Sequence, residues 1–192
     1  MSTDRQKSFT ARLSYEEYAV CFYELTLDAS TVTGYFRGKQ VTVPGTKGYA
    51  NLKDTKYLCL NNKLNKNEGP LLYFRYVDGG YIIYVREQGP QYGKSIGISN
   101  GWLLTSDTPV HMRLAAVGNE SLKLTLDDFP NDTYKELCLQ GPDGTLQYYK
   151  FVKTDVSFSY SYLVTYGGKS PIPFYFEIVE KNVPYLSNPE EI

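Results

Sequence analysis

Apolar and polar residues alternate in short runs along most of the chain, and this pattern predicts strands. The clearest example is residues 71–104, where the apolar runs are Leu71–Val77, Tyr81–Val85, 94–98 and 102–104. Asp78-Gly79-Gly80 and Asn100-Gly101 separate successive runs. These residues favour tight hairpin turns, because Gly, and to a lesser degree Asn, adopts left-handed backbone angles at little cost. The segment therefore predicts two consecutive β-hairpins.

Two further stretches predict strands nearer the N-terminus. The alternation of Tyr23, Leu25 and Leu27, together with Val20 and Phe22, favours a strand over the helix that Tyr15–Val20 alone would allow. Tyr35–Arg37 and Gln40–Val43 predict a second strand pair, which ends at Pro44-Gly45.

A pattern of Lys-x-aliphatic-small-aliphatic occurs three times, at Lys56–Leu60, Lys94–Ile98 and Lys135–Leu139. The three lysines are 38 and 41 residues apart. Three units of about 40 residues resemble the β-trefoil superfamily, in which three four-strand units close a six-stranded barrel capped by hairpins. The resemblance implies an all-β, β-trefoil-like barrel over roughly residues 20–180.

Two further segments resemble part of this repeat and favour a larger number of repeated units. Gly168–Pro173 resembles Gly93–Ile98, and Gly38–Val43 does so more faintly. Four or five units would fit a Greek-key β-sandwich better than a trefoil, so the sandwich stays as the alternative fold.

The chain of 192 residues is expected to form one all-β domain over residues 14–184. The polar start predicts a flexible N-terminal arm at residues 1–13, and residues 185–192 predict a flexible C-terminal tail.

Composition narrows the classes of partner. The chain has 19 Tyr, which suit both a half-buried sheet and a binding surface. Its net charge is −1 with scattered Lys and Arg, so nucleic acid is not expected as a partner.

The start of the chain has no apolar signal segment, and no stretch reaches the roughly 20 apolar residues of a membrane helix. The three cysteines read most simply as reduced thiols, with one disulfide plus a free thiol left open. Together these features predict a protein that is cytoplasmic or released without a signal peptide.

Catalytic and metal-binding patterns are not evident. His111 is the only histidine, and no nucleophile elbow, phosphate loop or dinucleotide fingerprint is present. The acidic residues of 127–132 are compatible with calcium, but without an EF-hand pattern they predict a solvated turn. We expect no enzymatic activity, no cofactor and no metal.

Residues 156–166 alternate aromatic or aliphatic residues with serines and a threonine. This is typical of a half-buried strand in a soluble sheet. The alternative is a membrane-inserting strand of a pore-forming toxin.

A sugar site needs an aromatic plate beside amide or carboxylate groups. One unit offers Tyr92, Asn100, Trp102 and Asp107, and the next offers Asp143, Gln147 and Tyr148. The alternative for Trp102 is a purely structural role, plugging or capping the barrel.

These features predict a non-enzymatic, lectin-like carbohydrate-binding protein with a defence or toxin role. The partner would be a carbohydrate or cell-surface glycoconjugate, and a membrane partner and a homo-oligomer stay open. The alternatives are a β-rich pore-forming or insecticidal toxin, a protease inhibitor presenting residues 86–93, and an intracellular structural or storage protein.

Overall fold

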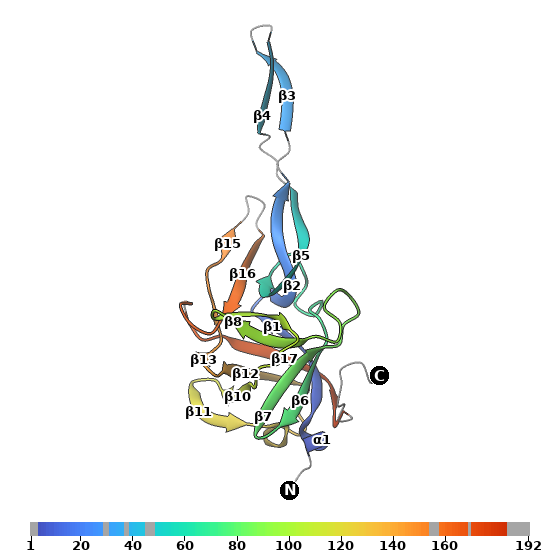
Figure 1. Ribbon diagram of the computed structural model, residues 1–192, viewed down its shortest axis with the longest axis vertical. Coiled ribbons are helices and arrows are strands. Elements are labelled where there is room, and N and C mark those ends of the chain that lie inside the picture. The colour runs from blue at the N-terminus through green and yellow to red at the C-terminus, as the bar shows by residue number, and fades with distance from the viewer. Residues whose placement is uncertain are drawn as a thin grey trace.

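The computed structural model describes residues 4–28, 31–36, 39–44, 49–153, 158–168 and 170–183, which are almost entirely β-structure (Figure 1). Within these residues every strand pairing is antiparallel, which confirms the all-β class. The elements are α1 (Asp4–Lys7), β1 (Phe9–Tyr15), β2 (Tyr18–Asp28), β3 (Thr31–Phe36), β4 (Lys39–Pro44), β5 (Tyr49–Asn61), β6 (Leu72–Val77), β7 (Gly80–Val85), β8 (Ser95–Ser99), β9 (Trp102–Ser106), β10 (Arg113–Ala116), β11 (Asn119–Leu124), the 3-10 turn η1 (Leu126–Asp128), β12 (Tyr134–Gly141), β13 (Gly144–Thr145), β14 (Gln147–Tyr148), β15 (Val152–Lys153), β16 (Ser159–Val164) and β17 (Pro173–Lys181).

Eight strands form a partly closed ring in the order β1-β2-β5-β16-β9-β8-β7-β6, and β6 returns to β1. At two places the ring is closed by a single residue pair. Strand β16 pairs with β9 at Val164↔Trp102, and β7 pairs with β8 at Tyr84↔Ser95. Closing a sheet removes the open edges at which copies of a protein can pair. The ring does not by itself show three trefoil units, and the trefoil stays a prediction.

Strand β1 is the junction of the molecule. It pairs with β2 and β6 in the ring, and with β17 along residues 9–14. From β17 the sheet continues through β12 and β10 to β11, and a bridge between Met112 and Tyr81 brings this branch back to β7.

The predicted N-terminal arm is wrong for residues 9–13, which lie in β1. Phe9, Ala11 and Leu13 are fully buried, so the alternation in this short run marks a central strand. The predicted tail at 185–192 lies outside the described residues, and the single domain over 14–184 stays a prediction.

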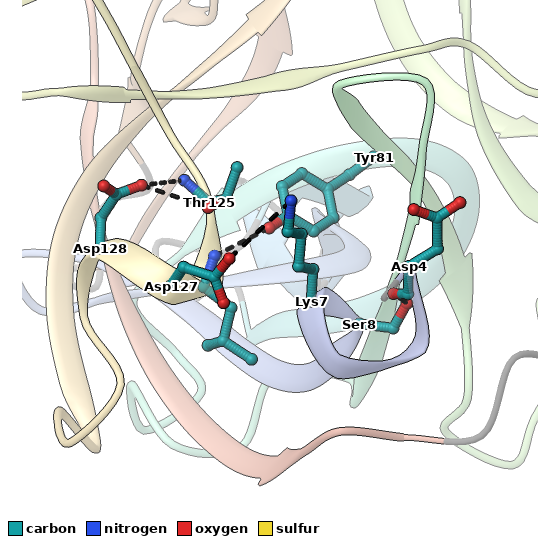
Figure 2. Close-up of polar contacts among 8 residues, drawn as sticks. Asp4, Lys7, Ser8, Tyr81, Thr125, Asp127 and Asp128 are labelled. Carbon is teal, nitrogen blue, oxygen red and sulfur yellow. Dashed lines mark hydrogen bonds and ion pairs between the residues drawn. The ribbon is translucent and has the colours of Figure 1, made fainter. Parts of the chain in front are cut away.

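The core around β1 is aromatic. The rings of Phe9 and Phe74 stack with centroids 4.7 Å apart, and Tyr81 meets Phe9 edge-on at 5.5 Å. The Tyr81 hydroxyl accepts a hydrogen bond of 3.1 Å from the Leu126 backbone N–H. Figure 2 shows that this phenol holds η1 to β7, while the ion pair of Lys7 with Asp127 holds η1 to α1.

The predicted hairpins are confirmed as β6–β7 and β8–β9. Their turns have positive φ at both central residues, Asp78 and Gly79 in one and Asn100 and Gly101 in the other. The sequence repeat also has a structural counterpart, because β10–β11 and β12–β13 repeat this succession of two hairpins.

The strands β2 and β5 continue beyond the body of the molecule as a ribbon, and β3 and β4 form a separate two-stranded sheet past its end (Figure 1). The strand pair predicted near Tyr35 and Gln40 is thus confirmed over Thr31–Phe36 and Lys39–Pro44.

Candidate functional site

Four aromatic side chains gather where β5, β9 and β16 meet, and we call them the aromatic platform: Tyr57, Trp102, Tyr149 and Tyr162. Trp102 is at the centre, with ring centroids 5.1 Å from Tyr149 and 5.4 Å from Tyr162. Tyr57 completes the group at 6.3 Å from Trp102 and 5.7 Å from Tyr162. The tilted and edge-to-face arrangements are those that aromatic pairs prefer. Tyr149 is 44% exposed and the other three rings are half-buried, so the platform faces solvent.

Strand register brings these residues together. Val164 pairs with Trp102, Tyr162 pairs with Cys59 two positions along β5 from Tyr57, and the Tyr149 N–H donates to the Tyr162 carbonyl. Within β16, Ser159 and Ser161 are buried whereas Tyr160 and Tyr162 are half-buried. The strand predicted over 156–166 is thus confirmed for Ser159–Val164, with its serines inward, and residues 156–157 lie outside the described part.

A carboxylate and an ammonium group border the platform. The Tyr162 hydroxyl donates a hydrogen bond to the Glu24 carboxylate, and Lys53 Nζ lies 3.6 Å from the other Glu24 oxygen. Burial, then the hydrogen bond to Glu24, raises the pKa of Tyr162, so its phenol stays a neutral donor at physiological pH. The charged groups at this edge of the platform are therefore Glu24 and Lys53.

The four candidate residues of the first unit are divided between the two ends of the β8–β9 hairpin. Asn100 and Trp102 lie at its turn, whereas Asp107 follows the opposite end of β9, about 17 Å away along an extended strand. Tyr92 lies in the loop that precedes β8, beside Gln91, whose side chain accepts a hydrogen bond from Thr105 at that same far end. The structure keeps Trp102 and Asn100 together and separates them from Asp107 and Tyr92.

The three candidate residues of the second unit also lie apart from one another and from the platform. Gln147 pairs with Val164 on the strand edge opposite Trp102, and its side chain accepts a 3.0 Å hydrogen bond from the Gly168 N–H. Tyr148 packs against Tyr15 and Phe151 instead of joining the platform. Asp143 is exposed in the β12–β13 turn.

Sequence reasoning did not find Tyr57, Tyr149 or Glu24. Tyr162 carried a usable signal, since it was part of the alternating run. The other three come from distant segments, and only cross-strand pairing brings Tyr57 and Tyr149 to Trp102 and Glu24 to Tyr162.

Other chemically active groups have structural partners. The His111 ring nitrogen lies 2.6 Å from the Val77 carbonyl oxygen, in an exposed position beside the β6–β7 turn. Cys21 and Cys59 are free and lie opposite each other on β2 and β5, and Cys138 is also free. Burial raises the pKa of Cys21 to about 12 and raises that of Cys59 and Cys138, so the three thiols stay protonated at neutral pH.

The acidic residues of 127–132 serve the local fold. Asp128 accepts from the Thr125 N–H at 2.6 Å, and Lys135 lies 3.1 Å from Asp132 (Figure 2 shows the first contact). Among the described residues no group of three or more His, Cys, Asp or Glu could hold a metal ion. No helix in the described part is long and apolar enough to cross a membrane.

A second aromatic pair borders a surface hollow of about 170 Å³ between β1, β12 and β17. Tyr134 and Tyr175 meet there with centroids 5.9 Å apart, beside Arg12 and Glu177. Tyr134 is 51% exposed. The pair resembles the platform in chemistry and is far from it in the sheet, which makes it a matched comparison site.

Comparison with known proteins found no matching protein family, no similar curated protein and no similar solved structure.

Proposed function

We propose that this protein is a non-enzymatic carbohydrate-binding protein that holds a sugar against the aromatic platform. The observation that carries the proposal is the solvent-facing cluster around Trp102, bordered by the Glu24 carboxylate. One face of a pyranose ring presents C–H groups, which pack on an aromatic ring, while its hydroxyls need hydrogen-bond partners at the edge. Rigid amphipathic rings supply that contact area at small entropic cost.

The position of the cluster supports binding over core packing. The aromatic rings that fill the core, such as Phe9, Phe74 and Phe176, are fully buried around β1. Trp102, Tyr57 and Tyr149 lie on the outer side of the sheet and keep part of each ring accessible. Small-ligand sites are usually lined by apolar and aromatic side chains together with a small number of polar groups.

The three-unit β-trefoil is retained as the proposed architecture of the body. The repeated pairs of hairpins, β6 to β9 and β10 to β13, support it.

The test is binding of the purified protein to a broad glycan array, followed by titration of the best glycan. Trp102→Ala and Tyr149→Ala remove two rings of the platform, and circular dichroism verifies that both variants are folded. We expect each variant to weaken binding by about tenfold or more, since stacked rings contribute on the order of 1 kcal/mol beyond their buried area.

Tyr134→Ala is the matched control, because it removes from the comparison site an aromatic ring about as exposed as that of Tyr149, at 51% against 44%. It should leave the affinity within about twofold of the wild type. Absence of glycan binding by the wild-type protein, or equal losses in the platform and control variants, would refute the proposal.

A further inference from the structure

The surface hollow between β1, β12 and β17 holds two opposite charges that do not pair with each other. Arg12 on β1 is directly opposite Glu177 on β17 in the strand register, and both side chains line the hollow. Arg12 forms its ion pair with Glu87 instead, and it also donates to the Gly69 carbonyl. Glu177 accepts a hydrogen bond of 3.4 Å from the Tyr134 hydroxyl. The hollow thus has a cationic side at β1 and an anionic side towards β12.

The cationic side has hydrogen-bond donors to spare. Both side-chain hydrogen bonds of Arg12 leave from Nη1, so its Nε and Nη2 groups make none with the described residues. Lys66 is exposed at the same hollow, and its ammonium group forms no ion pair within the described ranges. Ser14 is only 5% exposed, yet its hydroxyl makes no hydrogen bond to another described residue. A guanidinium, an ammonium and a hydroxyl together match the several acceptor oxygens of a phosphate group.

The anionic side is lined by aromatic rings. Tyr134 and Tyr175 are both exposed, with ring centroids 5.9 Å apart. A cation is attracted to such a ring within about 6 Å of its centroid, and Lys66 Nζ already lies 5.9 Å from the centre of the Tyr175 ring. Glu177 is joined to Tyr134, and the exposed Glu136 is opposite Tyr175 on β12. Aromatic rings beside carboxylates are the surroundings that quaternary ammonium groups prefer.

We infer that this hollow binds the phosphocholine group, with its phosphate on Arg12, Lys66 and Ser14 and its trimethylammonium against Tyr134 and Glu177. The group carries both charges a short chain apart, as the two sides of the hollow require. The volume of about 170 Å³ is below the roughly 300–1,000 Å³ of pockets for drug-sized molecules, so it suits a ligand of this small size. Phosphocholine exists as a free ester and as a lipid headgroup, and the two present the same chemistry to the hollow.

The experiment measures binding of the full-length protein to phosphocholine, choline, phosphoethanolamine and inorganic phosphate by titration calorimetry. None of these molecules carries a sugar, so the result is independent of the proposed glycan site. Phosphocholine should bind about tenfold or more tightly than choline or phosphate, because each of those engages one side of the hollow. Phosphoethanolamine should bind about threefold or more weakly than phosphocholine, since its primary ammonium is more strongly hydrated.

Two variants each remove one exposed side chain of the hollow. Tyr134→Ala should weaken the binding of phosphocholine and of choline alike, by about fivefold, because both ligands lose the ring that contacts their ammonium group. Lys66→Ala should weaken phosphocholine to a similar extent but choline by no more than about twofold, because choline has no phosphate. A general loss of structure would not separate the two ligands in this way.

Tyr166→Ala and Lys123→Ala are the matched controls, because they remove an exposed tyrosine and an exposed lysine that do not line the hollow. Each should bind phosphocholine within about twofold of the wild type. Circular dichroism verifies that all four variants are folded.

Vesicles distinguish the two sources of the ligand. Co-sedimentation with phosphatidylcholine vesicles that soluble phosphocholine competes away, without co-sedimentation with phosphatidylglycerol vesicles, would support the inference and identify the lipid headgroup as the ligand. Binding of soluble phosphocholine without co-sedimentation would support it and identify the free ester.

Three results would overturn the inference. The first is that the wild type does not bind phosphocholine. The second is that inorganic phosphate binds as tightly as phosphocholine, which would make the hollow a simple anion site. The third is that Tyr134→Ala and Tyr166→Ala weaken phosphocholine binding equally.

Discussion

At the scale of single residues, the position of a polar group in the sheet decides whether it connects separate elements of the fold. Arg12 projects from the central strand β1 and donates one hydrogen bond to the Gly69 carbonyl and another, of 2.8 Å, to Glu87. Glu87 also accepts from the Leu71 N–H at 3.2 Å. One guanidinium and one carboxylate thereby connect β1 to the loops on either side of β6 and β7.

Glu87 provides a pH-dependent prediction. Partial burial opposes ionisation, but the Arg12 hydrogen bond, the Leu71 N–H and the Arg12 charge together lower the pKa of Glu87. A carboxyl with a lowered pKa stabilises the fold above its unfolded pKa of about 4.3, and this stability is lost as the pH falls through the folded pKa. Glu87→Gln should be less stable than the wild type at pH 7, and the two should converge at lower pH.

The side chain of Glu87 is 48% exposed, so the difference at pH 7 should be at most about 1 kcal/mol. Urea unfolding at a series of pH values measures it, with Glu17→Gln in the exposed β1–β2 turn as the control. A difference that grows on acidification would contradict the prediction.

At the scale of elements, the tight hairpins fix how strands present their side chains. The Asn100-Gly101 turn sets the register in which Ser99 pairs with Trp102, and so places Trp102 at the first position of β9. A slip of one residue would move every side chain of β9 to the opposite face. The platform therefore depends on a turn that contributes no ring to it.

The two glycine turns give a matched stability prediction. Gly79 and Gly101 both have φ of +80°, but a Cβ at Gly79 meets nothing within 4 Å, whereas one at Gly101 runs into the Tyr166 ring. Gly79→Ala should cost about 1 kcal/mol from backbone strain alone. Gly101→Ala should cost more, because Tyr166 must also move.

Chemical denaturation of both variants tests this prediction, and glycan titration of Gly101→Ala tests the link to the platform. Equal losses of stability would show that Tyr166 relaxes without cost, and a stabilising Gly79→Ala would show that the turn is not strained.

At the scale of the whole molecule, β1 connects the eight-stranded ring to the branch that ends at β11. It pairs with three other strands and contributes Phe9, Ala11 and Leu13 to the core. The pairings of β1 with β6 and β17 join segments far apart in the sequence. Loss of β1 should therefore lower the free energy of unfolding of the whole protein.

Phe9→Ala should therefore destabilise the protein globally, by about 3–5 kcal/mol, because the change removes a fully buried ring that stacks on Phe74. Tyr166→Ala, which removes a largely exposed ring, should cost far less. Thermal and urea unfolding measure both. A loss below about 1 kcal/mol for Phe9→Ala would show that β1 is not required for the fold.

The sequence by itself determined the local β-structure. Period-two alternation gave several of the strands, though not β1, and Asp78-Gly79 and Asn100-Gly101 gave two hairpins with their turns, because strand periodicity and left-handed turn residues are local properties. It also identified Trp102 as a candidate, since a single Trp beside a turn stands out without any tertiary information.

Only the tertiary structure decided which strands are neighbours. The start of the chain looked like a polar arm, yet Phe9–Tyr15 became the central strand, because burial depends on partners more than 50 residues away. For the same reason Asp107 is separated from Trp102, whereas Tyr57 and Tyr149 pack against Trp102 and Glu24 meets Tyr162 at the edge of the platform. The energy of pairing distant strands is shared over the whole sheet, and no local window of the sequence contains it.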